Sequence, residues 1–129
     1  LDPRFIAWRD SGYRDVDAFL TEHETDIYSF PLFTMEFCDK LVEEVRSIQR
    51  SGVRVQRPNS MNRYGVVLNS IGMAGLMTAI QQTIKATGIA EDKFGFIGSS
   101  WDGHHSFVVQ YAPDKDLGLD MHTDDSDVT

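Results

Sequence analysis

A chain of 129 residues can enclose one hydrophobic core, and its 41% hydrophobic and 25% charged content is that of a globular protein. No apolar run approaches the roughly 20 residues that cross a bilayer, so no membrane span is predicted. Twelve Lys and Arg against 20 Asp and Glu give a net charge of −8, which argues against nucleic acid as a partner. The only cysteine, Cys38, excludes an internal disulfide and a Cys-rich zinc site.

The first half of the chain predicts a short helix, an edge strand and a long helix. Residues 16–24 are expected to form the short helix, and residues 26–33 (DIYSFPLF) the strand, at an edge because Pro31 cannot donate to a ladder. Thr34 is the expected N-cap of a helix over residues 35–52 that Gly52 ends. Its apolar residues recur at three- and four-residue spacing: Phe37, Cys38, Leu41, Val42, Val45 and Ile48.

The middle of the chain predicts a turn-rich connection, a strand over residues 64–68 and a second helix over residues 71–87. Gly88 is the expected terminator of that helix. A polar cluster on the connection either borders a substrate groove or reflects turn chemistry; it consists of Arg57, Asn62, Arg63 and Tyr64. Trp8 and Trp101 are expected to pack rather than to recognise a ligand.

After Gly88 the sequence favours β structure. Three short strand-like runs, FGFIGSS (94–100), HSFVVQY (105–111) and LGLDMHTD (117–124), are separated by turn residues. Helices first and strands afterwards predict an α+β fold. We therefore expect a single domain over residues 1–129, mainly helical to residue 93, with its sheet in residues 94–129.

The last of these runs holds the candidate functional residues, His122 and Asp124. Successive side chains of a strand alternate between its faces, so these two are expected to project from the same side. An imidazole and a carboxylate aimed at one point are two of the three ligands of the two-histidine, one-carboxylate site that binds non-haem Fe(II). Of the four histidines, only His122 has an aspartate two residues on.

Other chemistries fit this segment less well. Its acidic residues are expected either to form a solvated edge or to bind calcium. The glycine-containing calcium-binding loop is missing from the sequence, which argues against calcium. These acidic residues are Asp114, Asp116, Asp120, Asp124, Asp125 and Asp127. Ser126 and Cys38 lack the surroundings of a hydrolytic nucleophile. His104 and His105 are expected to be structural, with His105 as the fallback third metal ligand if the chain is complete.

The run SFVVQYAPDKDLGLDMHTDDSDVT, residues 106–129, carries a more specific pattern. Tyr111 ends an apolar strand, Pro113 and Asp114 follow, and His122 comes eleven residues after Tyr111, with Asp124 beyond it. This spacing resembles the iron-binding segment of the Fe(II)- and 2-oxoglutarate-dependent dioxygenases of the prolyl/lysyl hydroxylase type. The predicted order of helices and strands is similar to the lead-in to that family's double-stranded β-helix, or jelly-roll, barrel.

The resemblance implies that His122 and Asp124 are iron ligands and that the Tyr111 hydroxyl contacts 2-oxoglutarate. It implies Fe(II), 2-oxoglutarate as cosubstrate and ascorbate as an accessory reductant. The implied reaction hydroxylates a substrate C–H, in a prolyl or lysyl residue of a polypeptide or in a small molecule, while 2-oxoglutarate is decarboxylated to succinate and CO2. The family's second histidine and its basic cosubstrate anchor cannot be assigned in this sequence.

The chain is accordingly expected to be the N-terminal part of a catalytic domain, in which residues 94–129 begin the barrel, and to be inactive alone. A second class of function remains open, a catalytically silent β-barrel module that binds a partner through the acidic edge. The two differ because only the enzyme needs the missing histidine and basic residue. Compartment and oligomeric state are not predicted.

Overall fold

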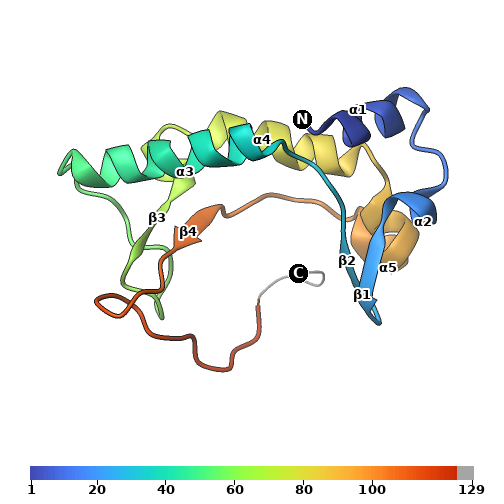
Figure 1. Cartoon of the computed structure of the whole chain (residues 1–129). Helices are drawn as coiled ribbons and strands as arrows, with labels where there is room; N and C mark the ends of the chain where they lie inside the picture. Colours follow the sequence, from blue (N-terminus) through green and yellow to red (C-terminus); the bar gives the residue numbers. More distant parts are fainter. Residues whose placement is uncertain (125–129) are drawn as a thin grey trace. The chain divides into compact units, whose positions relative to one another are not determined.

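The structure is a computed structural model that describes residues 1–124. Its internal contacts divide the chain into two compact units, Leu1–Arg50 and Ser51–Thr129. Each unit combines helices with a two-stranded antiparallel sheet (Figure 1). The mixture of helix and sheet agrees with the α+β prediction. Asp125, Ser126 and Asp127 lie outside the described residues.

The first unit begins with two short helices, continues with a β-hairpin and ends with a long helix. Its elements are α1 (Pro3–Asp10), α2 (Val16–Phe19), β1 (Thr21–Glu24), β2 (Ile27–Ser29) and α3 (Met35–Arg50). The prediction of a helix over residues 16–24 is wrong beyond Phe19. Leu20 has an extended backbone, and the residues after it pair with β2, with Thr21 opposite Ser29. Cross-strand hydrogen bonds replace the helical ones here.

Aromatic side chains form the core of the first unit. Phe5 is completely buried and Trp8 is 7% exposed. The Trp8 ring stacks on Phe19 with centroids 4.2 Å apart, and its indole Nε1 donates to the Arg14 carbonyl at 2.6 Å. Phe5 also lies against Phe30, with ring centroids 6.4 Å apart. The packing role predicted for Trp8 is confirmed, because its polar atom is satisfied inside the cluster.

The long helix α3 forms where its caps and periodicity place it. The Phe37 amide donates to the Thr34 hydroxyl at 3.2 Å, as expected of an N-cap. Gly52, just beyond the helix, has φ +73°, a conformation that glycine adopts without strain. Of its apolar residues Val45 is buried. The prediction for this element is confirmed.

Asp2, the N-cap of α1, provides a pH-dependent contribution to this unit. Its carboxylate accepts hydrogen bonds from the Arg4 guanidinium at 2.9 Å and from the Arg4 amide at 2.8 Å. The guanidinium first, and then the amide, lower the pKa of Asp2 from its usual 3.8 to about 2.

Because the folded pKa lies below the unfolded one, ionised Asp2 stabilises the fold above pH 3.8, and this contribution is lost as the pH falls through about 2. We expect a carboxyl-detected NMR titration of Asp2 to have its midpoint near pH 2, and Arg4→Gln to move that midpoint upward. A midpoint near 3.8 in the unaltered chain would show that the Arg4 contacts do not form.

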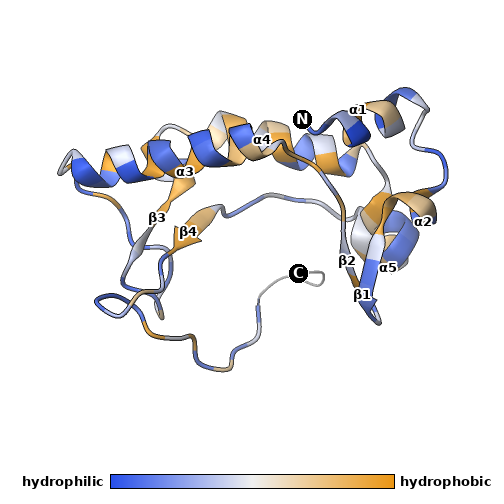
Figure 2. Cartoon of the chain, in the orientation of Figure 1, coloured by the Kyte–Doolittle hydropathy of each residue, from blue (hydrophilic) through white to orange (hydrophobic). Residues whose placement is uncertain are grey.

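The second unit contains β3 (Gly65–Val67), a 3-10 turn (Leu68–Ile71), α4 (Ala74–Lys85), α5 (Ile89–Ser99) and β4 (Phe107–Val109). Strands β3 and β4 are antiparallel, with Val66 opposite Val108, and both are hydrophobic in Figure 2. The core includes Val66, Leu68, Met77 and Ile89. The predicted strands over residues 64–68 and 105–111 and the helix that ends before Gly88 are confirmed.

Residues 94–100 were expected to be a strand, and this prediction is wrong because they belong to α5. Glu91 and Asp92 in the first turn stabilise the positive end of a helix. Gly95 interrupts the helix with φ +61°, and at Gly98 a β-carbon would lie 1.8 Å from the Ala90 carbonyl oxygen. A short apolar run with glycines therefore packs as a kinked helix, which periodicity alone does not distinguish from a strand.

The strand predicted over residues 117–124 is also absent, because these residues form neither helix nor strand. Just before them, Tyr111 and Asp116 form an isolated β-bridge. Leu117 is 82% exposed and Met121 fully exposed, so no neighbouring strand within residues 1–124 supports this segment. The described part of the chain forms no closed barrel. None of its helices has the length and apolar composition required to cross a membrane.

Candidate metal centre

The segment that carries the candidate ligands leaves β4 through a compact turn. The Gln110 amide donates to the Tyr64 carbonyl at 3.1 Å, which continues the β3–β4 ladder by one step. The chain then folds back, with the Ala112 amide donating to the Asp116 carbonyl at 3.2 Å. Tyr111 lies at the start of this turn, two residues beyond the end of β4, and forms an isolated bridge with Asp116.

Asp116 attaches the turn to the connection before β3. Its Oδ2 accepts hydrogen bonds from the amides of Arg63 at 2.9 Å and Tyr64 at 3.0 Å. The Tyr64 amide, and after it the Arg63 amide and the Asn62 side chain, lower the pKa of the Asp116 carboxyl despite an opposing effect of burial. The carboxylate is therefore held in its charged form and fixes the position where the 117–124 segment begins.

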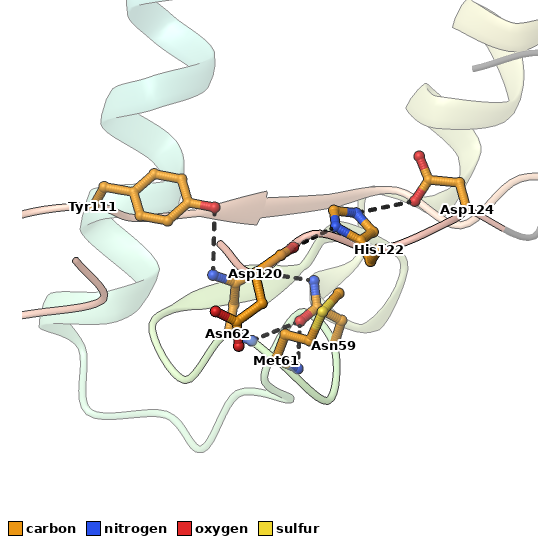
Figure 3. A network of polar contacts seen from close by, with 7 residues as sticks. All are labelled: Asn59, Met61, Asn62, Tyr111, Asp120, His122 and Asp124. Atoms are coloured by element: carbon orange, nitrogen blue, oxygen red, sulfur yellow. Dashed lines mark hydrogen bonds and ion pairs between the residues drawn. The ribbon is translucent and has the colours of Figure 1, made fainter. Parts of the chain in front are cut away.

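His122 and Asp124 lie together in the structure, as the spacing predicts, although no strand carries them. His122 Nε2 is 3.4 Å from Asp124 Oδ1, and His122 Nδ1 is 2.9 Å from the Asp120 carbonyl oxygen. Figure 3 shows the imidazole between these two oxygen atoms. Since a carbonyl oxygen only accepts hydrogen bonds, Nδ1 donates to the Asp120 carbonyl, and Nε2 is the ring nitrogen that faces Asp124.

This arrangement fits a metal ion. A proton on Nε2 would make this contact an imidazolium–carboxylate ion pair, and a metal ion would take the place of that proton between the two atoms. The two donor atoms are 3.4 Å apart, close enough that one metal ion would contact both. A carbonyl that accepts from the remote ring nitrogen is also the usual support of a metal-bound histidine. His122 and Asp124 are thus suited to hold Fe(II).

Within residues 1–124 no group of three or more His, Cys, Asp or Glu side chains could hold a metal ion. The fallback ligand His105 is engaged elsewhere, because its Nε2 lies 3.3 Å from the Pro58 carbonyl oxygen. His104 contacts Thr78 Oγ1 through Nε2 and Ser106 Oγ through Nδ1, both at 3.0 Å. Both histidines have the structural role that the sequence favours, and the described residues supply two candidate ligands.

Tyr111 is 49% exposed, and its hydroxyl oxygen lies 3.5 Å from Asn62 Nδ2. Asn62 itself is only 1% exposed. Sequence reasoning placed Asn62 in a polar cluster of undetermined role and missed its partner Asp116, which is 54 residues away along the chain. The sequence signal was the pair of asparagines in PNSMN, because Asn side chains commonly close turns.

Comparison with known proteins shows the family to which the chain belongs. Residues 1–93 match the model of the OGFOD2-like domain. The chain is 42% identical over 106 residues to "2-oxoglutarate and iron-dependent oxygenase domain-containing protein 2" of Xenopus tropicalis, covering 80% of this chain and 30% of that protein. It is 38% identical to the Homo sapiens protein of the same name, covering all of this chain and 39% of that protein.

A plant relative, "2-oxoglutarate and iron-dependent oxygenase domain-containing protein ICU11" of Arabidopsis thaliana, is 33% identical over 85% of this chain and 29% of its own length. No solved structure matches the chain. The chain spans roughly 30 to 40% of the length of these relatives. It belongs to the OGFOD2-like family, whose named members are 2-oxoglutarate and iron-dependent oxygenase domain-containing proteins.

Proposed function

We propose that this chain is the N-terminal part of the catalytic domain of an Fe(II)- and 2-oxoglutarate-dependent dioxygenase. His122 and Asp124 provide two iron ligands, and the Tyr111 hydroxyl binds 2-oxoglutarate. The observation that carries the proposal is the distance of 3.4 Å between His122 Nε2 and Asp124 Oδ1, with Nδ1 engaged by the Asp120 carbonyl. Membership of a family whose relatives are named iron-dependent oxygenases supports it.

The chain's own residues have separate tasks in this proposal. The Asp120 carbonyl keeps the His122 imidazole in the tautomer and orientation that a metal ligand needs. Asp124 contributes a negative charge that favours a divalent cation, and Tyr111 provides a hydroxyl for a carboxylate. The bound metal and 2-oxoglutarate supply the oxidation of a C–H bond, coupled to release of succinate and CO2.

The substrate in this proposal is a prolyl or lysyl residue of a polypeptide. A net charge of −8 favours a polypeptide that carries Lys or Arg near the modified residue. Residues 1–93 support the site, and residues 94–129 begin its double-stranded β-helix. Ascorbate would act as accessory reductant, as in the hydroxylases that the sequence resembles.

The test is succinate formation from 2-oxoglutarate in the presence of Fe(II) and oxygen. We expect the full-length protein that carries this segment to form succinate, and the 129-residue chain to form little or none, because two protein ligands hold iron less firmly than three. Robust turnover by the 129-residue chain would refute the proposal that the third iron ligand lies outside these 129 residues. Failure of the full-length protein to turn over 2-oxoglutarate would favour the silent binding module.

A further inference from the structure

Asn62 is a buried polar residue whose hydrogen bonds have a fixed direction. The Asn59 side-chain oxygen accepts from the amides of Met61 at 2.9 Å and Asn62 at 2.7 Å, which closes a tight turn. The Asn59 side-chain nitrogen then donates to Asn62 Oδ1 at 3.1 Å. Since Oδ1 of Asn62 is occupied by a donor, its Nδ2 must face the opposite direction.

The Asn62 Nδ2 group points at two residues of the segment that follows β4. It donates to the Tyr111 hydroxyl oxygen at 3.5 Å and to Asp116 Oδ2 at 3.4 Å. These are long hydrogen bonds, weak individually, but Asn62 is 1% exposed, so water does not replace them readily. Figure 3 shows the succession from Asn59 through Asn62 to Tyr111.

The consequence concerns the proton of the Tyr111 hydroxyl. A phenol oxygen that accepts a hydrogen bond from Asn62 keeps its own O–H as a donor for another group. Tyr111 is 49% exposed, so a ligand can approach this residue from solvent. The contact with Asn62 thus favours a hydrogen-bond acceptor, such as a carboxylate, as the partner of the Tyr111 hydroxyl.

We propose that Asn62 is a positioning residue that aims the Tyr111 hydroxyl proton at a carboxylate of 2-oxoglutarate. The inference rests on the proposed function and deepens it, because it adds a residue that acts through Tyr111 without contact with the cosubstrate. Asp116 completes the arrangement by holding the turn after Tyr111 against the Arg63 and Tyr64 amides.

The test is a double-mutant cycle in the full-length protein, with the Kd of 2-oxoglutarate measured by calorimetry without oxygen and with Mn(II) in place of iron. Tyr111→Phe is expected to raise this Kd about 10-fold or more, and Asn62→Ala about 5-fold. Because Asn62 acts through Tyr111, the double variant should bind 2-oxoglutarate no more weakly than Tyr111→Phe alone. Asn62→Ser replaces Asn62→Ala if the alanine variant fails to fold.

Gln81→Ala is the matched control, since it removes another side-chain hydrogen bond of the second unit, the one that Gln81 Nε2 donates to the Gly103 carbonyl at 2.6 Å, and leaves the hydrogen bonds of Asn59, Asn62 and Asp116 intact. It is expected to change the Kd less than about 2-fold, a rough bound for a residue without ligand contact. Additive effects of Asn62→Ala and Tyr111→Phe, or an unchanged Kd in Asn62→Ala, would overturn the positioning role alone. An unchanged Kd in Tyr111→Phe, or no binding of 2-oxoglutarate by the unaltered protein, would overturn the proposed function and this inference with it.

Discussion

Replacing His122 with alanine is expected to lower the Fe(II) affinity of the full-length protein by at least about 100-fold and to abolish succinate formation. Groups that merely hydrogen-bond to a metal-bound histidine contribute about 10- to 100-fold to metal affinity, and loss of a ligand costs at least as much. The variant also removes the imidazole that lies 3.4 Å from Asp124 Oδ1.

His23→Ala is the matched control for this variant. His23 is exposed, and its Nε2 contacts the Ser29 hydroxyl at 2.7 Å within the first unit, so its loss should leave both Fe(II) affinity and turnover unchanged. The measurement is an anaerobic Fe(II) titration of the two variants beside the unaltered protein. Iron-dependent turnover retained by His122→Ala would remove His122 from the metal centre and favour the binding module.

Replacing Gly65 with alanine is expected to destabilise the second unit by about 3 kcal/mol or more. Gly65 has φ +137°, and a β-carbon there would lie 1.9 Å from the Val108 carbonyl oxygen and 3.0 Å from Pro58 Cγ. The Val108 oxygen belongs to the backbone of β4, and Pro58 is fully buried. The Val108 oxygen cannot move without separating β3 from β4, so the strain is not relieved locally.

Gly75→Ala is the matched control, because Gly75 lies in the first turn of α4 and nothing is within 4 Å of its β-carbon position. It should be neutral or stabilise the protein by up to about 1 kcal/mol through higher helix propensity. Urea unfolding followed by circular dichroism measures both variants. Equal unfolding midpoints for Gly65→Ala and the unaltered chain would show that β3 and β4 do not approach as closely as described.

The elements that the sequence predicted correctly have local signals. Helix α3 has a Thr34 cap, an apolar stripe and Gly52 beyond its end, and each signal requires only neighbours in the sequence. The Val-rich strands β3 and β4 are recognisable for the same reason. Residues 94–100 lacked such a signal, since a short apolar run with two glycines fits a kinked helix and a strand equally well.

The geometry of the candidate site, too, was predicted correctly in part. Residue type and spacing identified Tyr111, His122 and Asp124, and the structure brings the last two within 3.4 Å; their roles as ligands remain predictions. The reason given for their proximity was wrong, because residues 117–124 form no strand. The contacts of Asn62 with Tyr111 and Asp116 span 49 and 54 residues of sequence, and no local pattern encodes a pairing of that range.

The central claim, that His122 and Asp124 hold a divalent metal, is tested most directly by titrating the 15N-labelled 129-residue chain with Mn(II) and recording amide NMR spectra. With Zn(II) as the diamagnetic reference, we predict that paramagnetic broadening appears first around Asp120, His122 and Asp124, and that His122→Ala removes it. Broadening that begins at the acidic residues of α3, Glu36, Asp39, Glu43 and Glu44, or that is unchanged in His122→Ala, would contradict the assignment.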